Sequence, residues 1–173
     1  ANNRGFGLQY VQGIGSFKTF DEFLRLTYGN DHWQTSTRVV LSTSENDFRY
    51  TNRDKKLNIY DEQMNIIDQY YPVERNKSGS YRDLHILQEV YYNLNSTNTF
   101  SVKYWGQKSD RSIPQVTSYE GADNANINNQ QDFDNKFVMD WTHFGENSKL
   151  VVRSGYNDKF LLYTLRNHVS GVG

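Results

Sequence analysis

The stretch "KFVMDWTHF", residues 136–144, guides the interpretation of the fold because apolar and polar side chains alternate along it. Successive side chains of a strand point to opposite faces of the sheet. One face of this strand would hold Phe137, Met139, Trp141 and His143. The other face would hold Val138, Asp140, Thr142 and Phe144. The stretch therefore predicts a β-strand with two distinct faces.

Further strands are predicted on both sides of this stretch. "KLVVRS" (149–154) and "KFLLYTLR" (159–166) follow it, and "GENS" and "GYND" supply the Gly, Asn, Asp and Ser that favour turns. Together they predict an antiparallel meander. Other strands are predicted at 36–44, at 99–105, and as two strands around a turn within 56–72.

One helix is predicted at "TFDEFLRLTYG", residues 19–29. Thr19 and Glu22 fit a capping box, the apolar residues that follow recur at helical spacing, and Gly29 fits a helix end. Residues 80–94 fit either a helix or a strand, and we favour a helix.

These elements predict an α+β fold, dominated by an antiparallel sheet, with one or two helices. A weak repeat relates residues 39–51 to 151–164 and, more faintly, to 95–105. Three such strand–turn–strand units suggest a β-trefoil as the alternative fold.

The composition indicates one folded domain over residues 1–173. Hydrophobic residues make up only 36% of the chain, but aromatic residues make up 15%, and disordered chains are poor in aromatic residues. With no cysteine, disulfides and thiolate metal sites are excluded. The net charge of -1, without a block of like charge, argues against nucleic acid as a partner. No apolar run approaches the ~20 residues of a membrane span, so no membrane span is expected.

A long polar loop is expected at about 106–135, because the apolar pattern fades there. Its most polar part is "GADNANINNQQDFDN", residues 121–135. The oxygen-bearing side chains do not follow the spacing of a calcium-binding loop, since Asn135 stands where the distal Glu belongs. We therefore expect a contact loop with no metal and no cofactor, although calcium binding is left open.

No catalytic motif is present in the sequence. The four histidines form no zinc-binding pattern, and there is no nucleophile elbow or phosphate-binding glycine loop. His143 near Asp140 is the best catalytic candidate, although a strand would direct the two side chains to opposite faces. Whether the chain is an enzyme stays open.

Surplus aromatic residues are the remaining signal, because exposed Tyr and Trp are favoured contact groups. The candidate ligand-binding residues are Trp33, Tyr71, Trp105, Tyr119, Asp123, Asn126 and Asn128. We expect a non-catalytic recognition module of a secreted, cell-surface or viral protein, extracellular or at the cell surface, that binds a glycan or a protein. The alternatives are a small hydrolase or toxin domain using His143 with distant carboxylates, and a structural coat or assembly subunit, since oligomers are possible.

Overall fold

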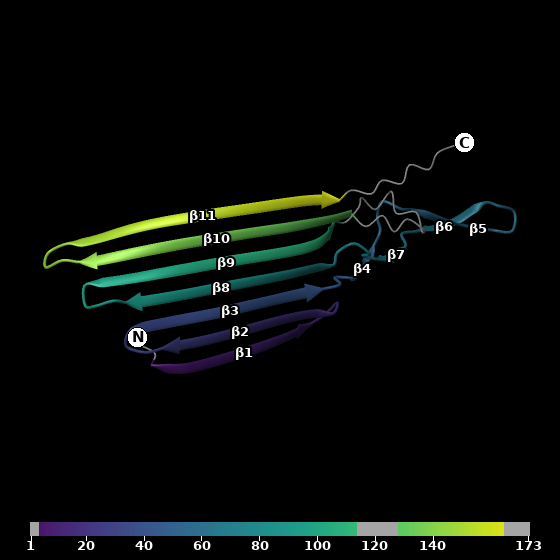
Figure 1. Cartoon of the computed structure of the whole chain (residues 1–173). Coiled ribbons are helices and arrows are strands. Elements are labelled where there is room, and N and C mark those ends of the chain that lie inside the picture. Colours follow the sequence, from purple (N-terminus) through teal and green to yellow (C-terminus); the bar gives the residue numbers. More distant parts are fainter. Residues whose placement is uncertain (1–3, 114–127, 165–173) are drawn as a thin grey trace.

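The computed structural model describes residues 4–113 and 128–164, and within them every regular element is a β-strand. Seven strands form one antiparallel sheet in the order β1-β2-β3-β8-β9-β10-β11 (Figure 1). They are β1 (Gly5–Gly15), β2 (Thr19–Gly29), β3 (Trp33–Ser44), β8 (Tyr81–Asn93), β9 (Asn98–Ile113), β10 (Asn128–Phe144) and β11 (Lys149–Thr164). The chain thus runs back and forth across the sheet, apart from the segment between β3 and β8.

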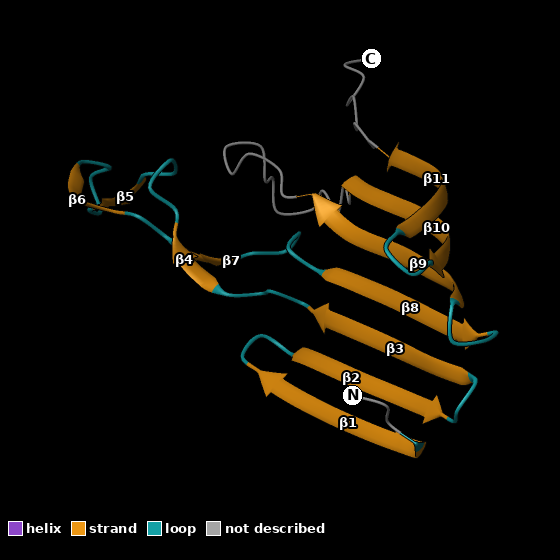
Figure 2. Ribbon diagram, turned by 90° about the vertical axis from the view of Figure 1, so that its left-hand side faces the viewer, coloured by secondary structure: helices purple, strands orange, loops and turns teal. Residues whose placement is uncertain are grey.

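The segment between β3 and β8 forms two small strand pairs beyond one end of the sheet (Figures 1 and 2). β4 (Arg49–Thr51) pairs with β7 (Val73–Arg75), and β5 (Leu57–Tyr60) pairs with β6 (Ile66–Tyr70). The β1–β2 turn lies at the same end, where the Phe17 ring meets the Phe48 ring edge-on at 6.0 Å. This end of the sheet therefore carries the larger connections.

Short turns close the opposite end of the sheet, between β2 and β3, β8 and β9, and β10 and β11. Asparagine side chains fix two of them. The Asn30 Oδ1 atom accepts hydrogen bonds from the backbone N–H groups of His32 and Trp33, at 2.9 and 2.7 Å. Asn95 Oδ1 does the same for Thr97 and Asn98, as is typical of asparagine at turns. The two ends of the sheet therefore differ in construction.

The predicted helix at 19–29 is wrong, because these residues form β2. Both the helical spacing and a period of two fit this segment, since Phe20, Leu24 and Leu26 also share one face of a strand. β2 pairs along its whole length with β1 and along most of it with β3, so its neighbours satisfy its backbone. Thr19 does not act as a cap, since its hydroxyl oxygen lies within hydrogen-bond distance of the Ser16 carbonyl oxygen (2.7 Å) and of Ser44 Oγ (2.9 Å).

The segment 80–94 is also a strand, β8, so the α+β class is overturned. Leu84, Ile86, Val90 and Tyr92 share one face of it, which is the period-two pattern that competed with the helix. The alternative fold, a β-trefoil, contains strands only, and so do the described residues. Seven of the described strands form one continuous sheet. The turn predicted at "GYND" is wrong as well, because β11 continues through it from Lys149 to Thr164.

The sheet has no covering layer within the described part of the chain. No large apolar side chain there is buried, and the buried side chains are Ser44, Asn52, Ser101 and Ser109. Single domains of ordinary type bury their apolar side chains against a second layer. The position of the apolar side chains in this sheet therefore requires an explanation.

Candidate functional site

The seven-stranded sheet has two chemically different faces, which its cross-strand register defines. We define the "apolar face" as the side of the sheet that carries the even-numbered residues of β1, β2, β8, β9 and β11. The odd-numbered residues of β3 and β10 lie on the same side. The opposite side is the "polar face". Three neighbouring cross-strand rows of the apolar face contain no charged side chain. The rows are Trp33–Tyr92–Phe100–Trp141–Val152, Phe6–Tyr28–Thr35–Val90–Val102–Met139–Ser154 and Leu8–Leu26–Thr37–Gln88–Tyr104–Phe137–Tyr156.

The charged side chains of the apolar face lie nearer the end with the larger connections. They are Glu22, Arg82, Lys108, Asp110 and Asp158. The charge-free rows therefore form a continuous band, which begins at the short-turn end and crosses all seven strands.

An aromatic row borders this band at the short-turn end. The Trp33 and Tyr92 rings are 4.4 Å apart, and the Phe100 and Trp141 rings are stacked at 6.3 Å. The Trp141 indole nitrogen donates to Asn98 Oδ1 at 3.1 Å. The row thus combines large apolar rings with a polar group near the turns.

The polar face is crossed by ion pairs between strands. Asp140 on β10 accepts hydrogen bonds from Arg153 on β11 (2.5 Å), and from Lys103 (3.1 Å) and Ser101 (3.2 Å) on β9. A second group joins Asp83, Ser109, Arg111 and Asp132 across β8, β9 and β10. These contacts link four of the strands through polar side chains.

Burial is inverted between the two faces. On the polar face, Ser109 is 0% exposed and the Asp140 side chain only 9% exposed. On the apolar face of the same two strands, Phe100 is 41% and Met139 50% exposed. In a protein surrounded by water, large apolar side chains are the ones usually buried and Asp is mostly exposed. On the inner strands the polar face is therefore the better-covered one, whereas the edge strand β11 is exposed on both faces, with Leu161 of its polar face 45% exposed.

The structure does not bring the catalytic candidates together. Asp140 lies on the polar face, whereas His143 lies on the apolar face, as the alternation along 136–144 predicts. The His143 ring nitrogen Nδ1 is 3.0 Å from Asn98 Oδ1, and Asp140 is engaged by Arg153 and Lys103. His143 and Asp140 therefore do not meet on either face of the sheet.

The ligand-binding candidates are dispersed. Trp33 is exposed in the aromatic row, Trp105 is exposed on the polar face under Lys136, and Tyr71 is exposed beside β6. Asn128 is the first residue of β10. Tyr119, Asp123 and Asn126 lie outside the described residues. Of the expected loop at 106–135, residues 106–113 and 128–135 belong to β9 and β10.

Two further kinds of feature are absent from the described part of the chain, a metal site and a membrane-spanning helix. Residues 4–113 and 128–164 contain no group of three or more His, Asp or Glu side chains arranged to hold a metal ion. The same residues include no helix of the length and apolar character that crossing a membrane requires.

The polar face also holds an ion pair between Arg38 on β3 and Glu89 on β8 (3.1 Å), beside Arg25 on β2, which the sequence did not predict. Two of these three strands, β2 and β8, were predicted to be helices. The available signal was the period-two placement of charged residues between apolar ones.

Among known proteins, the chain matches no family, and no curated protein is significantly similar to it.

Proposed function

We propose that the seven-stranded sheet is embedded in a membrane, with its apolar face against lipid hydrocarbon and its polar face towards an aqueous or polar interior. The observation that carries this proposal is the inverted burial on the inner strands, where Phe100 and Met139 are exposed and Ser109 and Asp140 are largely covered. A lipid-exposed sheet is the setting in which apolar side chains belong outside and polar ones inside. The chain would then be a structural part of an integral membrane protein.

The dimensions of the strands support the proposal. A tilted strand needs about 9–11 residues to cross the hydrocarbon layer, whereas strands of water-surrounded domains are most often about 5–6 residues long. The shortest strand of this sheet, β1 or β2, has 11 residues, and the longest, β10, has 17. Every strand of the sheet is therefore long enough to cross.

The aromatic row gives independent support. Trp and Tyr are enriched where a membrane meets water, because one part of the ring system is apolar and another is polar. Trp33, Tyr92 and Trp141 lie at the end of the charge-free band, beside the short turns. A sheet that packs on a second sheet has no need for such a border.

The sheet edges then require partners, because hydrocarbon offers no hydrogen bonds to backbone groups. Within the described residues, β1 and β11 each pair on one side only. They run in the same direction, since the sheet is antiparallel and has seven strands (Figure 1). They cannot complete an antiparallel pair with each other, so the proposal includes additional strands at both edges.

The expectation of no membrane span was drawn from the lack of a long apolar run, a criterion for helices. Alternating strands carry a much weaker sequence signal, so that criterion does not address this sheet. A cell-surface location agrees with a membrane-embedded sheet.

The test uses the three tryptophans, which sample both faces. Variants that keep one tryptophan, with phenylalanine at the other two positions, would be reconstituted into liposomes containing brominated lipid, which quenches indole fluorescence on contact. We expect strong quenching for the variant that retains Trp141 and weak quenching for the variant that retains Trp105. Trp105 is the matched control because it lies on the polar face of the neighbouring strand.

Equal quenching of Trp105 and Trp141, or none of either, contradicts the proposal. A chain that forms a compact, cooperatively unfolding oligomer in buffer without detergent also contradicts it. In that case a second copy covers the apolar face, and the assembly-subunit hypothesis is favoured instead.

A second candidate function, recognition of a glycan or a protein, is favoured by the hairpin of β5 and β6. Met64, Ile67, Tyr70 and Tyr71 are all exposed on or beside this hairpin, beyond the sheet end. Exposed aromatic and apolar groups that project from a scaffold are suited to contact a ligand. A glycan array compares Tyr71→Ala with Tyr60→Ala, a control in the same hairpin. Loss of a bound glycan for Tyr71→Ala alone supports this function, and no glycan binding by the unaltered chain contradicts the glycan hypothesis.

A further inference from the structure

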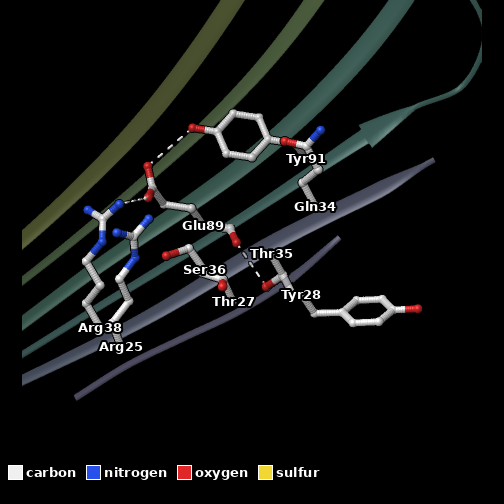
Figure 3. A pocket seen from close by; sticks show the side chains of 9 residues that line it. All are labelled: Arg25, Thr27, Tyr28, Gln34, Thr35, Ser36, Arg38, Glu89 and Tyr91. Carbon is white, nitrogen blue, oxygen red and sulfur yellow. Dashed lines mark hydrogen bonds and ion pairs between the residues drawn. The ribbon is translucent and has the colours of Figure 1, made fainter. Parts of the chain in front are cut away.

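A cavity of about 290 Å³ lies against β2, β3 and β8, and two arginines line it. Arg25 on β2 and Arg38 on β3 are direct cross-strand partners on the polar face. Figure 3 shows their side chains next to each other, with both guanidinium groups on the same side of the ribbon. Like charges directly opposite each other destabilise a sheet. The pair therefore favours an anion that offsets this repulsion.

The protein supplies only part of that negative charge. Glu89 on β8 is paired with Arg38, with 3.1 Å between Oε2 and Nη2. Its other oxygen accepts a hydrogen bond from the Tyr91 hydroxyl at 3.2 Å. Arg25 forms no ion pair with any residue in 4–113 or 128–164. Two guanidinium groups thus face one carboxylate, which leaves one positive charge in excess.

Two polar atoms beside this excess charge lack partners. Arg25 Nε and Ser36 Oγ are shielded from solvent and have no hydrogen-bond partner in the described part of the chain. Ser36 is two residues from Arg38 on the same face of β3, and it lines the same cavity. A buried donor without an acceptor is costly, so groups of this kind are normally satisfied. A ligand that displaces the neighbouring side chains from these two atoms would give a cationic donor and a hydroxyl donor the acceptor that they lack.

We propose that this cavity binds a small oxyanion, a phosphate or carboxylate group, through Arg25 and Ser36. A guanidinium group presents its donors in a planar fork that fits the oxygen atoms of either group. A neutral ligand would leave the excess charge unbalanced. The cavity lies on the polar face, so the inference does not depend on what covers the apolar face.

The test follows the Arg Nε–H signals of the isotope-labelled full chain by NMR, in whichever medium it folds. One titration uses inorganic phosphate and another uses acetate, both at constant ionic strength maintained with chloride. We expect a saturable shift of the Arg25 Nε–H signal with at least one anion. Arg25→Gln should weaken binding by about tenfold or more, as measured by calorimetry, because it removes a charge-assisted contact. Ser36→Ala should weaken it less.

Arg49→Gln is the matched control, since it removes the same charge from the exposed strand β4. Binding of phosphate alone or acetate alone supports the site and identifies its ligand class. Arg25→Gln relieves the repulsion with Arg38, so it should fold. If that variant does not fold, Arg25→Lys takes its place in the test. Lysine keeps the positive charge but lacks the planar guanidinium donors, so Arg25→Lys should also weaken binding. The proposal is overturned by the lack of a saturable shift with either anion, or by equal losses in the Arg25 and Arg49 variants.

Discussion

Val39 and Val40 are neighbours in β3, and their side chains lie on opposite faces of one sheet. Val39 lies between Leu24 and Ile86 on the apolar face, whereas Val40 lies between Phe23 and His85 on the polar face. Two identical residues in adjacent positions thus sample the two environments that the membrane proposal distinguishes.

Arginine at these two positions should have unequal effects. Val39→Arg is expected to lower the free energy of unfolding by about 2–4 kcal/mol, the cost of an arginine facing the middle of a bilayer. Val40→Arg should cost much less, because its side chain lies on the polar face. Urea unfolding of both variants in lipid or detergent, followed by circular dichroism, measures the difference. Equal losses would mean that both faces meet the same medium.

Asp140 is expected to stabilise the sheet through its three donors, Arg153, Lys103 and Ser101. Asp140→Asn should lower the free energy of unfolding by about 1.5–3 kcal/mol, a typical value for hydrogen bonds to a charged group. The cause is that Lys103 and Arg153 would keep their charges and lose their carboxylate.

Asp158→Asn is the matched control, because it also removes one carboxylate from the sheet. Asp158 lies on the apolar face. If this face meets lipid, as we propose, loss of a charge there does not destabilise the strand. Equal destabilisation by the two variants, measured by urea unfolding, would contradict the structural role assigned to Asp140.

The sequence allowed the strand meander to be predicted only where the alternation was unambiguous. In 136–144, the placement of His143 and Trp141 on one face is confirmed. In 19–29, Phe20 and Leu24 fit both a helix and a strand, and only pairing with β1 and β3 decides between the two. Such pairing joins residues distant in sequence, which local propensity does not reveal.

The two chemically different faces were harder to predict than the strands. The alternation along one strand shows that it has two faces, but it does not show which one is covered. In the structure the polar face is the better-covered one on the inner strands, as Ser109 and Asp140 indicate. The Arg25–Arg38 pair depends on the register of two strands, one of which was interpreted as a helix.

Gly106 on β9 leaves space for the ring of Tyr104. A Cβ atom at Gly106 would lie 2.5 Å from the Tyr104 hydroxyl oxygen, which donates a hydrogen bond to Asn135 Oδ1 at 2.7 Å. Gly106→Ala should displace the ring and break this bond, with a loss of about 0.5–1.5 kcal/mol. Gly155→Ala is the control, because its Cβ would meet nothing closer than 3.6 Å. Unfolding free energies of the two variants give the comparison, and a loss in Gly155→Ala alone would contradict it.

Asp61 fixes the turn between β5 and β6, outside the sheet. The Asn65 side-chain amide (3.0 Å) and the Asn65 backbone N–H (2.7 Å) donate to its carboxylate and hold its pKa below the ordinary value of 3.8. A carboxyl group whose pKa is lowered by folding contributes stability above its unfolded pKa. The contribution of Asp61 to the turn should therefore be complete at neutral pH and be lost as the pH falls below about 3.8.

Asn65→Ala should raise the pKa of Asp61 towards its ordinary value, because it removes the hydrogen bond that lowers this pKa most. An NMR titration of the Asp61 carboxyl carbon measures the pKa. Asn58→Ala is the control, since Asn58 lies in the same hairpin and donates to the Tyr60 hydroxyl oxygen rather than to Asp61. If Asn65→Ala left the midpoint unchanged, the turn would owe nothing to this amide. A midpoint that moved equally in both variants would indicate a general loosening of the hairpin.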